Sequence, residues 1–125
     1  MRCARIIAAG FSALLMTAAA LPAYAGYGAL AHDDASGKYG LSWDKATQRQ
    51  ADELAMKDCV ESSCKIIFRT KARQCGAIAT AEKPGSSAWG GSVKPTRDAA
   101  ALAAMNDCQK HTSGQCKVRA SGCNR

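Results

Sequence analysis

The stretch Tyr27-Gly28-Ala29-Leu30-Ala31 returns later in the chain as Cys75-Gly76-Ala77-Ile78-Ala79. Three further matches follow it in the same order: Tyr39-Gly40 with Trp89-Gly90, Ala55-Met56-Lys57-Asp58-Cys59 with Ala104-Met105-Asn106-Asp107-Cys108, and Cys64-Lys65-Ile66 with Cys116-Lys117-Val118. An ordered series of matches within one short chain indicates an internal repeat. The sequence therefore predicts one domain, residues 26–125, made of the repeats 26–74 and 75–125.

Each repeat is predicted to open with a β-hairpin. Small apolar residues form the first strand, and turn residues, Gly37 in one repeat and Pro84-Gly85 in the other, lead into the second strand. The predicted strands are residues 27–31 and 38–43 in the first repeat, and residues 75–80 and 87–93 in the second.

A helix and a last strand complete each repeat. Thr47 with Gln50 has the pattern of a capping box, and Thr96 holds the matching position. Apolar residues, mostly alanine, follow at helical spacing, and each helix is expected to end at a cysteine, Cys59 or Cys108. The predicted last strands are residues 64–71 and 116–120.

The predicted fold class is α+β. We expect two pseudo-symmetric ββαβ repeats that share one antiparallel sheet, with both helices on one face of it. The alanine faces of the helices would then pack on Ile66, Phe68 and Val118, because alanine lets a helix lie close to a sheet.

The first 25 residues have the pattern of a signal peptide. Arg2 and Arg5 precede an apolar run at 6–21, and Ala23-Tyr24-Ala25 supplies small residues where a signal peptidase cleaves. The alternative is a retained membrane anchor, but the run is short and alanine-rich for a span of about 20 residues. We therefore expect cleavage after Ala25, no membrane span after processing, and a periplasmic or secreted protein.

The cysteines indicate a disulfide framework. Of the seven, Cys3 lies in the predicted signal peptide, and an even count of six in a short exported chain is typical of such a framework. The repeat predicts the bonds Cys59–Cys64 and Cys108–Cys116, each joining a helix to the next strand. Cys75 and Cys123 each follow the last strand of a repeat, so we expect them to pair across the repeats. The alternative, a metal site, lacks paired C-x₂-C knuckles.

The pattern resembles a known bacterial family, the domain-of-unknown-function family 4189. The resemblance is carried by the Y/C-G-A-[IL]-A opening, the [YW]-G strand, the Thr-capped alanine-rich helix that ends in Cys, and the C-K-[IV] strand. It covers nearly all of residues 26–125. Gly91 and Val93 depart from it, standing where further aromatic residues are common. The resemblance implies an exported α+β domain and brings no established catalytic residues.

The chain offers few groups for chemistry. His32 and His111 could act as base and acid in RNA cleavage, but the repeat places them in different loops, so we expect solvated turn histidines. His32-Asp33-Asp34 could bind a metal, yet such residues are also ordinary turn formers. The sequence therefore predicts no enzyme: no catalytic residues, no metal ligands and no cofactor.

The charge pattern is the more informative feature. The chain has 17 Lys+Arg against 10 Asp+Glu, for a net charge of +7, and the excess lies in residues 64–125. Alternation along residues 65–73 would place Lys65 and Arg69 on the face opposite Ile66 and Phe68. We consider two interpretations, a solvated outer sheet face and a docking surface for an anionic partner. The residues of this predicted basic stripe are Lys65, Arg69, Lys71, Arg73, Lys117 and Arg119.

The functional hypothesis is an exported non-enzymatic binding protein. It would recognise another protein in the envelope or outside the cell, as an inhibitor, immunity factor or effector does. The first alternative is a binder of anionic polymers or cell-wall ligands that uses the same stripe. Nucleic acid is less favoured because few aromatic residues remain for base stacking. The second alternative is a small secreted hydrolase or nuclease that uses the two histidines.

Overall fold

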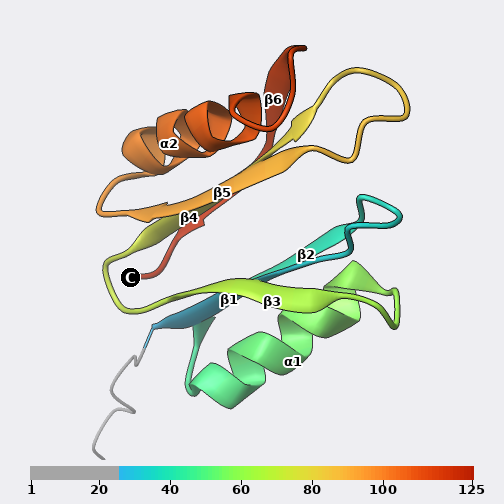
Figure 1. Cartoon of the computed structure of the whole chain (residues 1–125). Helices are drawn as coiled ribbons and strands as arrows, with labels where there is room; N and C mark the ends of the chain where they lie inside the picture. Colours follow the sequence, from blue (N-terminus) through green and yellow to red (C-terminus); the bar gives the residue numbers. More distant parts are fainter. Residues whose placement is uncertain (1–25) are drawn as a thin grey trace, which may run out of the picture.

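The computed structural model describes residues 26–125, and the predicted signal peptide, residues 1–25, lies outside the described residues. The described chain has two units, each with two strands, a helix and a third strand in that order (Figure 1). The first unit contains β1 (Tyr27–His32), β2 (Tyr39–Lys45), α1 (Gln48–Cys59) and β3 (Lys65–Thr70). The second contains β4 (Cys75–Ala81), β5 (Trp89–Lys94), α2 (Arg97–Gln109) and β6 (Cys116–Cys123).

The two units form two separate antiparallel sheets. Their strand orders are β2-β1-β3 and β5-β4-β6. The sheets stack face to face, and α1 and α2 cover the two opposite outer faces (Figure 1). The α+β class is thus as predicted, whereas the single shared sheet with both helices on one face is wrong.

The side chains between the sheets explain this arrangement. Leu30 of β1 and Ile78 of β4 are the largest fully buried side chains, and they alternate along their strands with alanines that face the helices. In one shared sheet with both helices on one face, Leu30 and Ile78 would lie on the solvent side. Stacking two sheets buries both faces of each sheet, so both sets of apolar side chains leave water.

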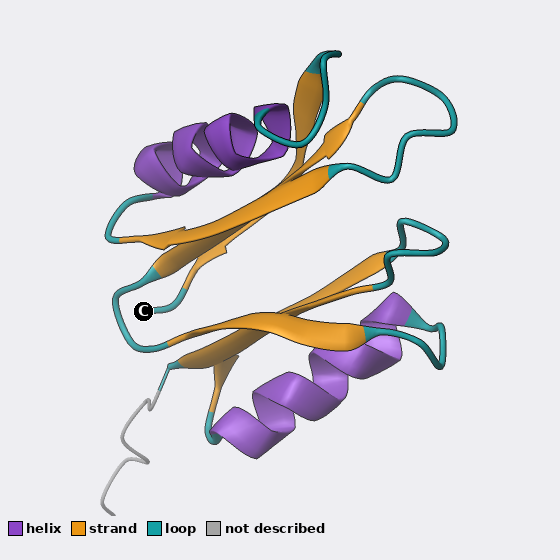
Figure 2. Ribbon diagram, viewed as in Figure 1, coloured by secondary structure: helices purple, strands orange, loops and turns teal. Residues whose placement is uncertain are grey.

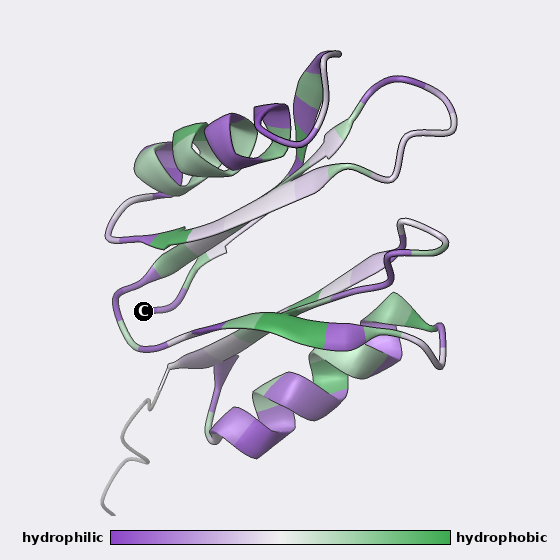
Figure 3. Cartoon of the chain, viewed as in Figure 1, coloured by the Kyte–Doolittle hydropathy of each residue, from purple (hydrophilic) through white to green (hydrophobic). Residues whose placement is uncertain are grey.

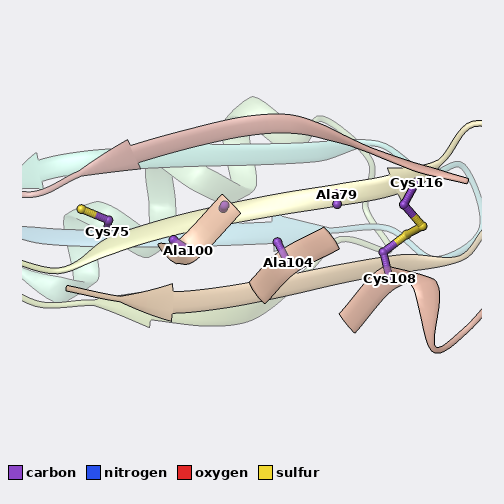
Figure 4. Packing of buried hydrophobic residues seen from close by; sticks show 7 residues of the cluster. Cys75, Ala79, Ala100, Ala104, Cys108 and Cys116 are labelled. Atoms are coloured by element: carbon purple, nitrogen blue, oxygen red, sulfur yellow. A yellow bond between two sulfur atoms is a disulfide. The ribbon is translucent and has the colours of Figure 1, made fainter. Parts of the chain in front are cut away.

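Each helix lies directly on its sheet. Buried alanines, Ala100 and Ala104 on α2, pack against Ala79 of β4 beside the disulfide-bonded Cys108 (Figure 4). Gly90 of β5 is needed here, because a Cβ on it would overlap the α2 backbone at Ala104 and Cys108. Thr47 and Thr96 cap the helices as predicted, since their hydroxyls accept the backbone N–H groups of Gln50 and Ala99 at 3.1 and 3.2 Å.

A β-bulge in each last strand changes the predicted alternation. Ala31 pairs with Ile66 and Leu30 pairs with Phe68, so β3 has one extra residue between them. Ile66 therefore packs against the helix, whereas Phe68 faces the second sheet. Ile66 and Val118 lie on the helix faces as predicted, and the same placement of Phe68 is wrong.

Residues 26–125 contain three disulfides, in the three pairs that the repeat predicts: Cys59–Cys64, Cys108–Cys116 and Cys75–Cys123. The first two join a helix to the strand after it. The third differs from the prediction in its role, because Cys75 starts β4 and is the register partner of Cys123 on β6. It therefore closes the second unit on itself and does not link the two units.

Candidate functional site

The two ends of the sandwich have different chemistry. At one end lie the hairpin loops after β1 and β4, and at the other lie the β3–β4 turn and the end of β6 (Figure 2). The loop end carries an open groove of about 730 Å³. We call it the Trp89 groove, and the side chains that matter in it are Asp34, Ser86, Ser87, Trp89, Asp107 and His111.

Trp89 is held in place by two residues of the first unit. Its indole Nε1–H donates to Asp34 Oδ1 at 2.9 Å, and its ring lies against His32 with the ring centroids 4.8 Å apart. Asp34 Oδ1 also lies 3.1 Å from His32 Nδ1, which carries the hydrogen if the carboxylate accepts that bond. One carboxylate oxygen thus orients both rings across the contact between the units.

His32 lies at the end of β1 and is 2 % exposed, so the prediction of a solvated turn histidine is wrong. Its Nε2 is buried and has no hydrogen-bond partner among the described residues. A carboxylate orients a catalytic histidine in the same way, but there the other ring nitrogen must reach the substrate. In this structure the second nitrogen of His32 is enclosed by protein.

His111 does lie in an exposed turn after α2, as predicted, and it lines the Trp89 groove. Its Nε2 is 3.7 Å from Asp107 Oδ1, while Asp107 Oδ2 accepts the backbone N–H of Gly91 at 3.2 Å. The two histidines therefore contact two different carboxylates, Asp34 and Asp107, and only His111 lines the groove. This arrangement does not supply a paired acid and base.

Asp33 serves the turn between β1 and β2. The Ser36 hydroxyl donates to its carboxylate at 2.6 Å, and the Ser63 hydroxyl and the backbone N–H of Ala35 also donate. The Ser36 bond and the other donors outweigh the cost of burial and lower the pKa of Asp33 to about 2. Its oxygens are thus engaged by local donors. Among residues 26–125 no cluster of three or more His, Cys, Asp or Glu has a metal-binding arrangement.

The predicted basic stripe does not form one surface. The bulge in β3 places Lys65 and Arg69 on opposite faces of this strand, with Lys65 opposite His32 and Arg69 opposite Ala29 in the register. In addition, β3 contacts β5 and β6 contacts β2, so the two strands lie on different edges of the sandwich. Lys117 and Arg119 are therefore separated from Lys65 and Arg69.

Two residues of the stripe have partners within the chain. Arg69 makes a two-pronged pair with Asp52 of α1, with nitrogen–oxygen distances of 2.9 to 3.1 Å. The Arg69 guanidinium holds the pKa of Asp52 below its usual range. Arg119 donates to Thr80 Oγ1 at 2.7 Å. These contacts fasten β3 to its helix and β6 to its neighbouring strand.

Other stripe residues gather at the end opposite the groove. Lys71 and Arg73 lie exposed in the β3–β4 turn, and the register brings the ends of β2 and β5 to the same end, since Tyr27 pairs with Lys45 and Cys75 with Lys94. The acidic residues next to these cations in the sequence are Asp44, which precedes Lys45, and Asp98, which follows Arg97. We call this surface the basic end, and it comprises Lys45, Lys71, Arg73, Lys94 and Arg97.

Sequence reasoning missed the Trp89 groove. The sequence predicts a strand at Trp89 and a turn at Asp34, and nothing in their spacing shows that they meet across two sheets. The available signal was the match of Tyr39-Gly40 with Trp89-Gly90, because the repeat places both aromatic residues at the same end of their hairpins.

The described chain has no helix that is both long and apolar enough to cross a membrane. Its three disulfides are compatible with an oxidising compartment outside the cytoplasm. Fold and site together define a small α+β domain of two stacked three-stranded sheets, stapled by disulfides and carrying an open polar groove.

Comparison with known proteins gives the family. The family model described as a domain of unknown function, DUF4189, matches residues 27–123, and the chain belongs to this family. Protein Rv1269c of Mycobacterium tuberculosis is 39% identical over 74 residues, which are 59% of this chain and 54% of that protein. Rv1813c of the same organism is 33% identical over 86 residues, 69% of this chain and 55% of that protein. The chain thus spans about half the length of the curated relatives it matches.

A solved structure also resembles the chain. The NMR structure of Rv1813c from Mycobacterium tuberculosis is 27% identical, with a TM-score of 0.57, and the match covers 99% of this chain and 99% of that one. The resemblance supports the fold of residues 26–125.

Proposed function

We propose that the protein is an exported, non-enzymatic binding protein that recognises another protein through its basic end. The observation that carries this proposal is the collection of exposed cations, Lys71, Arg73, Lys94 and Arg97, at one end of a disulfide-stapled domain. Charges of one sign on a firm surface attract a partner of the opposite sign and speed its association.

Export and duplication belong to the same proposal. Residues 1–25 would direct secretion and be removed, which agrees with an oxidised cysteine set in residues 26–125. The two units would be pseudo-symmetric copies of one ancestral ββαβ element. Their common strand orders and their matching helix caps, Thr47 and Thr96, support this.

An anionic protein is favoured over a polymer because the basic end is short and bounded. A polymer needs a continuous track of cations, and the bulges and the separation of β3 from β6 interrupt such a track. Fewer residues are therefore available to contact a partner than the predicted stripe contains. Lys71 and Arg73 remain from the stripe, while Arg69 is engaged by Asp52.

The test compares captured proteins between variants. The oxidised domain 26–125 is immobilised beside the variant Lys71→Glu/Arg73→Glu, and envelope and culture-fluid proteins retained by each are quantified by mass spectrometry. We expect one protein retained in stoichiometric amount by the wild type and bound about 10-fold more weakly by the variant, since reversal removes two favourable charges. Lys83→Glu, an exposed lysine at the other end, is the control and should bind as the wild type does.

Two results would contradict the proposal. A partner retained equally by the wild type and the double variant would exclude the basic end as its site. Retention of only nucleic acid, lipopolysaccharide or wall polymer, lost at high salt, would instead support the polymer-binding alternative.

A further inference from the structure

The Trp89 groove combines one aromatic wall with two carboxylates from different units. Asp34 comes from the loop after β1, Asp107 comes from α2, and Trp89 starts β5. We infer that this groove is a binding site for an organic cation, an ammonium or guanidinium group carried by a small ligand or by a basic side chain of a peptide. The site lies at the opposite end of the molecule from the basic end.

The charges of Asp34 and Asp107 are not paired with lysine or arginine within the described chain. Among residues 26–125, the ionisable group that each of them contacts is a histidine, at 3.1 and 3.7 Å. By contrast Asp52, Glu53 and Glu61 are paired with Arg69, Arg49 and Lys38. Both groove carboxylates are nevertheless held in place by neutral donors, Asp34 by Trp89 Nε1–H and Asp107 by the Gly91 N–H. Two negative charges in one groove that lack a lysine or arginine partner attract a cation.

The aromatic wall favours the same ligand. The Trp89 ring is oriented by its contact with His32 and by its bond to Asp34, so it does not have to be ordered when a ligand arrives. Its N–H is already used by Asp34 and the residue lines the groove, so a ligand that touches the indole there touches its carbon and π surface. Trp is the aromatic residue that attracts cations best. A groove of about 730 Å³ is within the range of small-molecule sites.

The first experiment is an NMR titration of the oxidised domain, in which the Trp89 indole N–H is observed. The indole signal is assigned with Trp89→Phe, since Trp43 gives the other indole signal of the domain. The cationic probes are tetramethylammonium and agmatine, and the neutral probes are tert-butanol and N-acetylglucosamine, all at constant ionic strength. We expect saturable shifts with the two cations, with dissociation constants on the order of 1 mM for one cation–π contact and two screened charges.

The variant Asp34→Asn/Asp107→Asn tests the charge separately from the fold. Asparagine keeps an oxygen that can accept the Trp89 and Gly91 hydrogens, so the groove retains its shape. We expect this variant to bind tetramethylammonium about 10-fold more weakly. Asp98→Asn, in the first turn of the same helix as Asp107, is the matched control and should bind as the wild type does.

Four results would overturn the inference, and the first three concern the cations and the charge. These are the absence of a saturable shift with either cation, equal shifts with tert-butanol, and wild-type affinity in Asp34→Asn/Asp107→Asn with an unchanged amide spectrum. Saturation by N-acetylglucosamine alone would assign the groove to a sugar and also overturn it. Capped Gly-Lys-Gly and Gly-Arg-Gly peptides distinguish the source of the cation, because binding tighter than that of agmatine indicates a basic peptide segment and weaker binding indicates a free amine.

Discussion

The two units share their order of elements and differ in what they place between the sheets. The first unit supplies large aromatic side chains, and Phe68 lies over Gly76 and Gly91 while Trp43 lies over Gly122. In Figure 3 the middle of β3 is strongly hydrophobic and the neighbouring strand β5 of the second unit is paler. At these positions the first unit provides the bulk and the second provides the space, since closely packed interiors place large side chains opposite small ones.

The units also differ in how their open ends are fastened. In the second unit the Cys75–Cys123 disulfide joins the start of β4 to the end of β6. In the first unit the repeat places Tyr27 and Lys71 at those positions. Asn124, the residue after Cys123, fastens this end of the first unit instead of a disulfide. Its buried side chain donates to Thr70 Oγ1 and Lys71 O and accepts from the Asp44 N–H. The second unit is therefore closed at this end by a disulfide, whereas the first unit is held at the same end by hydrogen bonds from a residue of the second unit.

The largest effect should come from removing the bond that only the second unit has. Cys75→Ala/Cys123→Ala opens the longest loop, and the chain-entropy estimate is a loss of about 4 kcal/mol in the free energy of unfolding. Cys59→Ala/Cys64→Ala opens a loop of only a few residues and should cost about 2 kcal/mol. Urea unfolding followed by circular dichroism measures both. Equal losses would show that loop length does not govern the contribution of these disulfides.

The next prediction tests how the Phe68 side chain of the first unit packs over Gly91 of the second unit. Phe68→Ala should cost about 3 kcal/mol, because it leaves a cavity between the sheets. Gly91→Ala places a Cβ 3.0 Å from the Phe68 ring and should cost about 1 kcal/mol. The double variant should lose less than the sum, since the new methyl group then occupies space that Phe68 left.

Gly114→Ala is the control for this cycle, because its Cβ would be 3.6 Å from its nearest neighbour, the Thr112 hydroxyl. It should leave the unfolding free energy nearly unchanged. Strictly additive losses in Phe68→Ala and Gly91→Ala would mean that the aromatic ring and the glycine do not act together.

Asn124→Ala tests the polar link of the first unit. The change leaves the buried Thr70 hydroxyl and the Asp44 N–H without their partner, and we expect a loss of about 2 kcal/mol. Asn106→Ala, an exposed position on α2, is the control and should differ little from the wild type. Thermal unfolding at neutral pH compares the two. An equal effect of both substitutions would show that the hydrogen bonds of Asn124 do not stabilise the contact between the units.

The sequence could predict the features that depend on neighbouring residues or on matching positions in the two repeats. The helices, their threonine caps, the hairpins and the three cysteine pairs all depend on residues close in the chain or at matching positions. The packing of one unit on the other could not be predicted, because alternation in β1 and β4 looks the same for one sheet or two. A single bulge residue in β3 also reversed the face of Phe68 and divided the predicted basic stripe. The Trp89 groove depends on the packing of one unit on the other, which is why sequence reasoning considers two of its polar side chains, Asp34 and His111, without bringing them together.

The smallest predicted effect distinguishes the turns of the two hairpins. Asp33 and Ala81 hold matching positions, and each donates its N–H across its hairpin, to Lys38 O and Ala88 O. Only Asp33 adds a buried carboxylate, whose pKa is lowered from its ordinary 3.8 to about 2, chiefly by the Ser36 hydroxyl.

The direction of the pH effect follows from that lowered pKa. Below about pH 4 the unfolded chain takes up a proton at Asp33 more readily than the folded chain does. The stabilisation from Asp33 is therefore complete above this range and is lost as the pH falls towards 2. In Asp33→Asn this part of the acid dependence should vanish, so the difference in urea midpoint from the wild type should narrow between pH 5 and pH 2. Ser36→Ala should reduce the same dependence while leaving the carboxylate in place. A difference that stays constant over this range would show that Asp33 acts through the shape of the turn and that its charge contributes nothing to the difference between the units.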